Sequence, residues 1–313
     1  LVHAAAEAGA DAVKLQTYTP DTITIKCDRS YFRIEEGTLW SGKILYDLYG
    51  EAFTPWEWQP ELKILAEKLG MQCFSSPFDS TSVDFLETLN VPAYKVASFE
   101  IVDFPLLKKI GATKKPVIVS TGMATLAEIS DAIDTLRQAG TTEIALLKCV
   151  SAYPAPPEAM NLSTIPHLSE AFGVPAGLSD HTLGITVPVT SVALGGTIIE
   201  KHLTMSRAVP GPDSPFSLEP HEFRDMVSAV RIAEKAVGAV TYGVGPSEVK
   251  SRAFRRSLFV VQDVRKGETF TEDNVRSIRP GHGMHPRHLP DVLGRIARHD
   301  ISRGTPLTWP DVA

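Results

Sequence analysis

Over its first three quarters the chain alternates short apolar runs, rich in β-branched residues, with longer amphipathic stretches of helical spacing. This alternation is typical of parallel strands joined by crossover helices. We expect strands at about residues 12–17, 71–76, 93–98, 116–121, 143–151, 175–180 and 197–203. The pattern therefore predicts an α/β fold with a mainly parallel sheet.

Most of the predicted strands end in hydroxyl, charged or imidazole side chains. Polar groups at the C-terminal ends of parallel strands are typical of a (β/α)8 TIM barrel. A doubly wound open sheet, the competing architecture, normally carries a Gly-rich phosphate turn after its first strand, and none is visible. Because an amphipathic helix precedes the first visible strand, we predict a TIM barrel whose first strand lies upstream of Leu1.

Two segments interrupt the alternation. Residues 19–59 form a long insertion rich in aromatic and turn residues, which either serves as a lid or oligomer contact or packs over the barrel mouth. From about residue 255 the pattern changes to short strands and turns. We therefore predict a barrel domain at 1–245 and a small β-rich domain at 255–313. We expect association with the barrel or a partner subunit to help stabilise a domain this small.

Charge, cysteine content and hydropathy exclude several classes of protein. The 31 Lys and Arg against 37 Asp and Glu give a net charge of −6, which leaves no electrostatic footprint for nucleic acid. The three cysteines are widely spaced, which argues against a disulfide scaffold and favours a reducing cytoplasm. No apolar run reaches the roughly 18 residues of a membrane span. We expect a cytoplasmic protein without nucleic-acid or membrane partners.

His181 and His202 follow consecutive predicted strands, within Gly-Leu-Ser-Asp-His and Ile-Glu-Lys-His. In a barrel these two side chains would lie side by side at the mouth and could bind one divalent metal. Mn²⁺ or Mg²⁺ would suit additional oxygen ligands, whereas imidazoles also admit Co²⁺ or Zn²⁺. A single histidine is more often structural, so the prediction rests on the pair.

Lys14 and Lys95 stand inside otherwise apolar strands. A buried ammonium is costly without a partner, and a bound phosphate or carboxylate would supply one. Nearby hydroxyls could donate hydrogen bonds to the same anion, those of Ser76, Ser98, Ser120, Thr121 and Ser179. An alternative is that Lys95 forms a Schiff base, as in metal-independent aldolases.

Residues 209–220, here called the proline-rich arm, contain four prolines and follow the last predicted strand. Because proline restricts the backbone, this segment could hold Asp213 over the barrel mouth, or it could be a plain connector. In the small domain, Arg279 stands on a tight turn. Its guanidinium suits a carboxylate or an amide carbonyl, although the residues alone favour an ordinary surface arginine.

Taken together, these motifs resemble the sialic-acid synthase family, whose members condense phosphoenolpyruvate with an amino-sugar aldehyde to make nonulosonic acids. The resemblance covers nearly the whole chain, and its motifs lie at residues 8–17, 74–78, 93–98, 119–123, 153–154, 177–182, 200–202, 210–213 and 279–281. It implies that His181 and His202 bind a divalent metal, Mn²⁺, Mg²⁺ or Co²⁺. It implies a phosphoenolpyruvate site of Lys14, Ser76, Lys95, Ser98, Ser120 and Ser179.

The same resemblance implies that Glu100, Tyr153 and Asp213 face the sugar, with Lys95 and Glu100 joining the two histidines in catalysis. The small domain is similar to the antifreeze-like (SAF) domain of the family, which implies a domain-swapped homodimer with Arg279 reaching the sugar from the partner. The chain departs from sialate synthases at Ser151, where they have an asparagine. It also lacks the family's first strand, which supplies a glutamate to the sugar site.

Three segments, residues 42–49, 53–58 and 211–219, resemble the pseudaminic acid synthase branch more than the sialate or legionaminate branches. This resemblance implies a substrate of the 2,4-diacetamido-2,4,6-trideoxy altrose type and metal-assisted condensation with C–O cleavage. Two readings of other classes remain open. One is a lysine Schiff-base aldolase, and the other is a non-enzymatic carbohydrate-binding or ice-binding protein.

Overall fold

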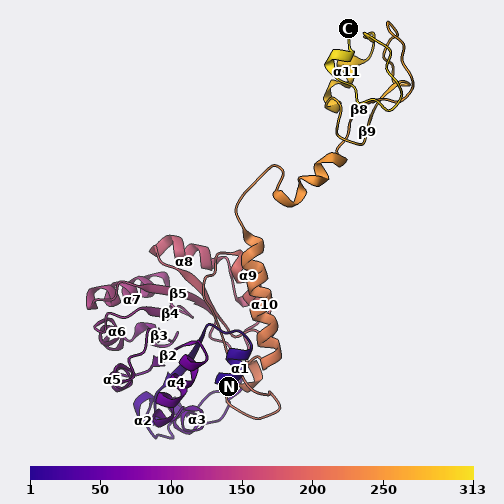
Figure 1. Cartoon of the computed structure of the whole chain (residues 1–313). Helices are drawn as coiled ribbons and strands as arrows, with labels where there is room; N and C mark the ends of the chain where they lie inside the picture. The colour runs from indigo at the N-terminus through magenta and orange to yellow at the C-terminus, as the bar shows by residue number, and fades with distance from the viewer. The chain divides into compact units, whose positions relative to one another are not determined.

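The computed structural model describes residues 1–313, which divide into two units, Leu1–Gly238 and Ala239–Ala313 (Figure 1). The first unit contains one parallel sheet of seven strands in the order β1 to β7. The strands are β1 Ala12–Thr17, β2 Gln72–Pro77, β3 Tyr94–Val96, β4 Val117–Ser120, β5 Ile144–Cys149, β6 Ala176–Asp180 and β7 Ile199–Lys201. A doubly wound sheet would not follow chain order. The predicted TIM-barrel-like α/β fold is therefore confirmed.

Helices precede, connect and follow the seven strands and lie around the outside of the curled sheet (Figure 1). They are α1 Val2–Glu7, α2 Pro20–Ile23, α3 Leu45–Ala52, α4 Gln59–Lys68, α5 Ser80–Thr88, α6 Phe104–Gly111, α7 Leu126–Ala139, α8 Thr164–Phe172, α9 Thr186–Ala193 and α10 Pro220–Val237. Local signals fix their ends. The side chain of Asp79 caps α5, and Thr125 and Glu128 form a capping box at the start of α7.

The largest apolar cluster lies between the sheet and its outer helices. It includes Tyr94 and Val96 of β3 and Val117 and Val119 of β4, packed with apolar side chains of α5 to α8. Since side chains alternate along a strand, the residues between them, such as Lys95, face the interior of the barrel. The outer core thereby determines which side chains reach the interior face.

The observed elements differ from the predicted ones mainly at their ends. Strand β7 covers Ile199–Lys201 rather than residues 197–203. The insertion of residues 19–59 contains α2 and α3, with further short turns of 3₁₀ helix at Ser30–Phe32 and Trp56–Trp58. The strand expected upstream of Leu1 concerns residues outside this sequence and stays a prediction.

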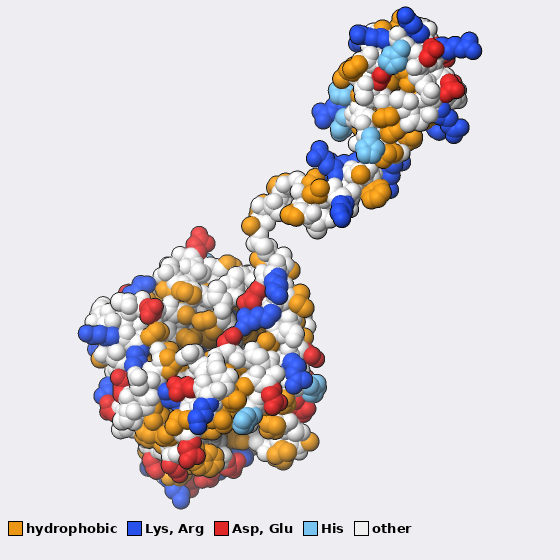
Figure 2. Space-filling view, viewed as in Figure 1, with side chains coloured by type: hydrophobic (Ala, Val, Ile, Leu, Met, Phe, Trp, Pro, Cys, Tyr) orange, Lys and Arg blue, Asp and Glu red, His pale blue; other side chains and the backbone are white.

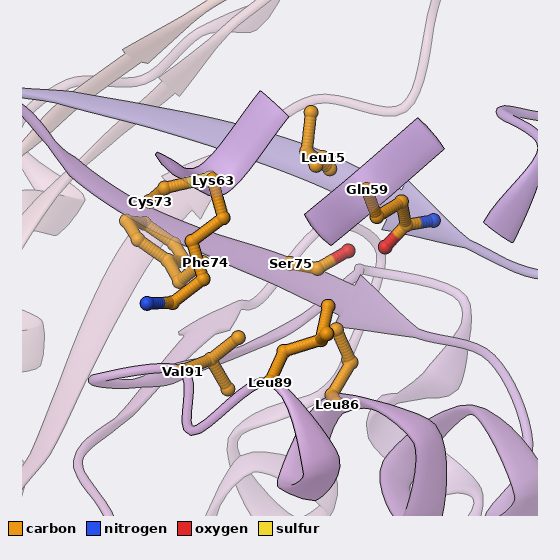
Figure 3. Close-up of a pocket in the computed structure, with 9 residues that line it drawn as sticks. All are labelled: Leu15, Gln59, Lys63, Cys73, Phe74, Ser75, Leu86, Leu89 and Val91. Carbon is orange, nitrogen blue, oxygen red and sulfur yellow. The ribbon is translucent and has the colours of Figure 1, made fainter. Parts of the chain in front are cut away.

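A small pocket lies where β1 and β2 meet the outer helices, with Leu15, Gln59, Cys73 and Ser75 in its lining (Figure 3). Beside it Thr17 Oγ1 donates to Gln59 Oε1 at 2.8 Å and lies 2.6 Å from Ser75 Oγ. Ser75 thus has a structural partner on the outer side, whereas Ser76 faces the interior.

The second unit has its own antiparallel pair of strands, β8 Ser257–Val260 and β9 Val275–Ile278, and a short helix α11 Leu289–Val292. Its apolar cluster is separate and includes Leu258, Phe270 and Leu307. Just before β9, residues 272–274 form a turn, which the Asn274 side chain closes by accepting from Thr271 N at 2.8 Å. Basic side chains are frequent on the surface of this unit (Figure 2). No helix in the chain meets the length and hydropathy needed to cross a bilayer.

Candidate active site

Three charged side chains on β1, β3 and β7 meet on the interior face of the sheet. Lys14 Nζ donates to Glu200 Oε1 at 2.7 Å, and Lys95 Nζ lies 3.8 Å from Glu200 Oε2. Burial alone would raise the pKa of Glu200, but the two ammonium groups hold it well below its usual range. The interior therefore contains two cations that share one carboxylate.

Lys95 is fixed by groups of the sheet itself. Its side chain is 2% exposed, and Nζ donates to Ser120 Oγ at 2.7 Å and to the Val96 carbonyl at 2.9 Å. Burial lowers the pKa of Lys95 to about 8, an effect that the charge of Glu200 opposes. The ammonium is thus pre-oriented and poorly solvated, which strengthens its attraction for an anion.

The loops after β3, β4 and β5 come together around Ser98. Its hydroxyl lies 2.9 Å from Ser151 Oγ. Gly122, at a φ of +45°, approaches so closely that a Cβ there would lie 2.4 Å from Ser98 Cβ. A larger residue would push the loops apart, so glycine is required for this approach.

Two buried polar atoms at the strand ends have no hydrogen-bond partner, Ser76 Oγ and Glu100 Oε2. Burial raises the pKa of Glu100 to about 7, with Lys95 opposing the rise. Unsatisfied buried polar atoms are rare in native proteins and often mark a binding site. Both atoms are therefore suited to a polar ligand.

The two predicted metal ligands do lie side by side, with ring centroids 5.4 Å apart. His181 Nδ1 lies 2.9 Å from the Val150 carbonyl, and His202 Nδ1 lies 3.3 Å from Asp213 Oδ2. Burial lowers the pKa of His181 to about 4, so its imidazole is neutral near pH 7. A neutral imidazole whose Nδ1–H donates to a carbonyl offers Nε2 to a metal.

No group of three or more His, Cys, Asp or Glu side chains is close enough together to hold a metal. The histidine pair fits a metal only as a two-ligand set, with the other positions left to substrate and water. The Cys149 thiol, 4.0 Å from His181 Nδ1, lies against the nitrogen that the Val150 carbonyl already engages.

The rings of Tyr153 and Phe216, here called the aromatic wall, lie beside the two histidines. The Tyr153 ring lies 4.5 Å from His181 and 5.1 Å from Phe216, and Phe216 lies 5.0 Å from His202, between centroids. Trp40, from the insertion, lies 5.6 Å from Tyr153 and donates from Nε1 to the Pro212 carbonyl at 3.0 Å. The insertion therefore contacts both the aromatic wall and the proline-rich arm.

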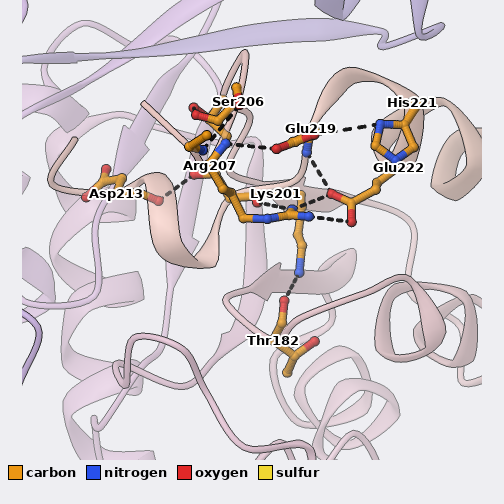
Figure 4. Close-up of polar contacts among 11 residues, drawn as sticks. Thr182, Lys201, Ser206, Arg207, Asp213, Glu219, His221 and Glu222 are labelled. Atoms are coloured by element: carbon orange, nitrogen blue, oxygen red, sulfur yellow. Dashed lines mark hydrogen bonds and ion pairs between the residues drawn. The ribbon is translucent and has the colours of Figure 1, made fainter. Parts of the chain in front are cut away.

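A polar network fastens the proline-rich arm to the start of α10 (Figure 4). Arg207 donates to Glu222 Oε1 at 2.8 Å and to the Ser217 carbonyl at 3.0 Å. The Glu219 amide donates to Glu222 Oε2 at 2.8 Å. These contacts hold the arm so that Asp213 reaches His202. Burial alone would raise the pKa of Asp213, but the hydrogen bond and the electrostatic attraction of His202 lower it.

Asp180 and Lys201 form a second charged pair on the outer side of β6 and β7. Their side chains are both 0% exposed, and Nζ lies 2.5 Å from Oδ2. Asp180 also accepts from the Thr182 amide at 3.0 Å, while Lys201 donates to the Thr182 carbonyl (Figure 4). The pair lies directly beside both histidines in sequence, so it fixes the strand ends that present them.

In the first unit, the structure places all but one of the predicted site residues on the interior face of the strands or in the segments that follow the strands' C-terminal ends. Arg279 is the exception, since it lies exposed in the second unit, just after β9. The sequence placed Asp180 and Glu200 only beside the two histidines, and it gave no individual role to Trp40 or Lys201. The signal for Glu200 was its position two residues before His202, which puts both side chains on the same side of the extended chain at the end of β7.

The comparisons with known proteins agree with this geometry. Residues 1–242 match the NeuB family, and residues 255–313 match the SAF domain. The chain is 46% identical to the pseudaminic acid synthase of Helicobacter pylori over 99% of this chain and 92% of that protein. It is 36% identical to the N,N'-diacetyllegionaminic acid synthase of Legionella pneumophila, over 100% and 89%.

Among solved structures, the N-acetylneuraminic acid synthetase of Leptospira borgpetersenii superposes with a TM-score of 0.70 at 30% identity. The match covers 80% of this chain and 82% of that one. The resemblance to sialic-acid synthases predicted from the motifs is thereby confirmed. A parallel sheet in chain order, the paired lysines and histidines at its C-terminal ends and these matches lead to one conclusion: the chain belongs to the NeuB family and carries a SAF domain.

Proposed function

We propose that the chain condenses phosphoenolpyruvate with a 2,4-diacetamido-2,4,6-trideoxy hexose of the altrose type, forming pseudaminic acid and phosphate. The prediction of such a synthase is confirmed by identities of 44 to 46% to pseudaminic acid synthases over 99% of the chain. Legionaminate synthases are more distant, at 36%. In the structure, the carrying observation is the cluster of Lys14 and Lys95 on the same interior face as the histidine pair.

The anionic substrate would occupy the lysine side of this site. Lys14 and Lys95 supply positive charge for its phosphate and carboxylate, and the unpartnered Ser76 hydroxyl supplies a donor. The remaining hydroxyls assigned to this substrate are those of Ser98, Ser120 and Ser179. Their side chains are nearly completely buried, so their orientation is determined before the substrate arrives.

The histidine side would hold a divalent metal, Mn²⁺, Mg²⁺ or Co²⁺, through Nε2 of His181 and of His202. When bound, the metal supplies Lewis acidity toward the aldehyde oxygen of the open-chain sugar. Asp213 orients the His202 ring through Nδ1, as the Val150 carbonyl orients His181.

The sugar would lie against Glu100, Tyr153 and Asp213, with Arg279 of the partner subunit completing the site. The Tyr153 and Phe216 rings present an apolar surface, which suits the methyl group of a 6-deoxy sugar. The raised pKa of Glu100, about 7, lets its carboxyl exchange a proton near neutral pH, as general acid–base catalysis requires.

In the proposed reaction, the enol carbon of phosphoenolpyruvate attacks the aldehyde carbon and forms the new C–C bond, while the C=O π electrons move to the aldehyde oxygen, which gains a proton. Positive charge develops at the adjacent carbon, where water adds and gives up a proton. The tetrahedral intermediate then loses its hydroxyl proton and expels phosphate by C–O cleavage, which leaves a ketone. Lys14 and Lys95 offset the negative charge on phosphate and carboxylate throughout. The pre-oriented serine hydroxyls hold the anion in place while the carbon atoms react.

We further propose a homodimer in which the SAF domain of one subunit covers the barrel of the other. Residues 239–313 contain 12 Lys and Arg against 8 Asp and Glu, whereas residues 1–238 contain 19 against 29. This complementary charge favours contact between unlike units of two chains. A cytoplasmic location is consistent with the three cysteines, all of them free thiols.

The direct test is phosphate release from phosphoenolpyruvate with a panel of acetamido-sugar aldehydes, with and without chelator. We expect turnover with the altrose-type sugar, loss of turnover with chelator, and loss of metal-dependent turnover in His202→Ala. His167→Ala, an exposed histidine of α8, is the matched control.

Several outcomes would redirect the assignment. Preference for the legionaminate or neuraminate precursor would move the chain to another branch of the family. Full activity in His202→Ala would overturn the metal site. Borohydride trapping of substrate on Lys95, with activity that survives chelator, would indicate the Schiff-base aldolase. Carbohydrate binding without phosphate release would indicate a binding protein.

A further inference from the structure

The Glu200 carboxylate occupies the contacts that the proposed function assigns to an anionic substrate. Oε1 accepts from Lys14 Nζ at 2.7 Å and from Ser179 Oγ at 3.2 Å, and Oε2 lies 3.8 Å from Lys95 Nζ. Lys14, Lys95 and Ser179 are three of the six residues proposed to hold phosphoenolpyruvate. Glu200 thus satisfies, from within the chain, groups that a phosphate or carboxylate oxygen would otherwise contact.

The two lysines depend on Glu200 to different degrees. Lys95 is 2% exposed and retains hydrogen bonds to Ser120 Oγ and to the Val96 carbonyl, which do not involve Glu200. Lys14 is 19% exposed, and Glu200 is the hydrogen-bond partner of its ammonium. Loss of the Glu200 charge would leave Lys95 in place and leave Lys14 free to contact a bound anion.

The charge on Glu200 also acts on whatever binds between the lysines. A carboxylate within hydrogen-bond distance of Lys14 repels a second anion at the same place, and partial burial strengthens that repulsion relative to water. The Glu200 side chain is 16% exposed, so solvent screens the interaction only in part. Repulsion of this kind weakens the retention of phosphate without removing the cations that attract it.

We propose that Glu200 is an internal competitor for the anion site. It keeps Lys14 and Lys95 paired before substrate binds and limits the hold of the site on the phosphate product. The inference rests on the proposed function, because it takes phosphate as the leaving group. Glu200 is accordingly a positioning residue that acts through the two lysines.

The test compares the full chain with Glu200→Gln, which keeps the shape and one acceptor oxygen but removes the charge. Inorganic phosphate is titrated calorimetrically into each protein in the presence of chelator, so that no metal takes part. We expect phosphate to bind Glu200→Gln about tenfold more tightly. In turnover, the same variant should show a lower kcat and stronger product inhibition by phosphate.

The matched control is Glu87→Gln. Glu87 Oε1 also accepts from a lysine, Lys115 Nζ at 2.7 Å, but on α5, outside the barrel interior. The control changes the net charge by the same amount and should leave phosphate affinity unchanged. A general effect of added positive charge would instead move both variants together.

Thermal melting keeps the inference testable if Glu200→Gln is less stable. Because a ligand stabilises the state that binds it, phosphate should raise the melting temperature of Glu200→Gln more than that of the natural chain. Glu200→Asp, which withdraws the charge by one methylene, should bind phosphate with intermediate affinity.

Unchanged or weaker phosphate binding by a folded Glu200→Gln protein would overturn the inference, as would the absence of phosphate binding by both chains. Failure of the proposed function looks different. In that case Glu200→Gln still binds phosphate more tightly, but neither chain releases phosphate with any sugar of the panel.

Discussion

Glu100 combines a buried, unpartnered oxygen with a pKa raised by burial from 4.5 to about 7. Between these two pKa values the folded chain therefore binds up to one more proton than the unfolded chain. The free energy of unfolding consequently falls as the pH rises from 4.5 to about 7. We predict that Glu100→Gln gains stability relative to the natural chain across this range, by up to about 3 kcal/mol. Urea unfolding at about pH 5 to 8, followed by circular dichroism, measures the difference.

The exposed Glu61→Gln on α4 is the control for removal of a carboxylate as such. A stability difference between the natural chain and Glu100→Gln that stays constant with pH would show that Glu100 titrates near its ordinary pKa in the folded chain.

The ends of β6 and β7 are joined by the Asp180–Lys201 pair, both of whose side chains are inaccessible to solvent. Removing one partner leaves an uncompensated buried charge, so we predict that Lys201→Met destabilises the chain by about 3–5 kcal/mol. The double variant Asp180→Asn/Lys201→Met should be less destabilised because neither charge remains. Urea unfolding of both variants tests this.

Lys109→Met provides the reference for an exposed pair. Lys109 Nζ lies 2.5 Å from Asp84 Oδ1, but these side chains are 39% and 65% exposed. Its loss should cost less than about 1 kcal/mol. Equal costs for Lys201→Met and Lys109→Met would contradict the structural role given to the buried pair.

The opposite charge of the two units makes the proposed dimer sensitive to ionic strength. Between about 0.1 M and 1 M salt the screening length falls from about 10 Å to about 3 Å, which weakens attraction between unlike surfaces. We predict that the dimer dissociation constant rises over this range, as measured by analytical ultracentrifugation. A chain ending at Gly238 should sediment as a monomer at both salt concentrations, and a dimer of that truncated chain would contradict the proposed arrangement.

The parallel sheet could be predicted from sequence because both of its signals are local. Short apolar runs indicate buried strands, and the polar residues that follow them indicate the C-terminal ends of those strands. The adjacency of His181 and His202 followed from the same signals, since consecutive strands of a barrel are neighbours. The boundaries were less predictable. Strand β9 begins at Val275 because the Asn274 side chain closes a turn, a contact that apolar periodicity does not encode.

The charge distribution within the site could not be predicted from the sequence alone. Lys14 and Lys95 were recognised as cations in apolar strands, and an external anion was expected as their partner. Glu200 lies more than 100 residues from either lysine in sequence, and only the curvature of the sheet brings its carboxylate between them. Trp40 and Tyr153 are also far apart in the sequence, and no sequence pattern predicts which strand end an insertion will contact.

The position of Trp40 gives the chain an optical reporter of its own site. Its indole contacts Tyr153 and donates to the Pro212 carbonyl, so its emission depends on the insertion, the aromatic wall and the proline-rich arm at once. Of the other three tryptophans, Trp56 and Trp58 lie at the end of the same insertion and Trp309 lies in the second unit. With those three replaced by phenylalanine, fluorescence would follow binding of the proposed sugar in real time and without a label.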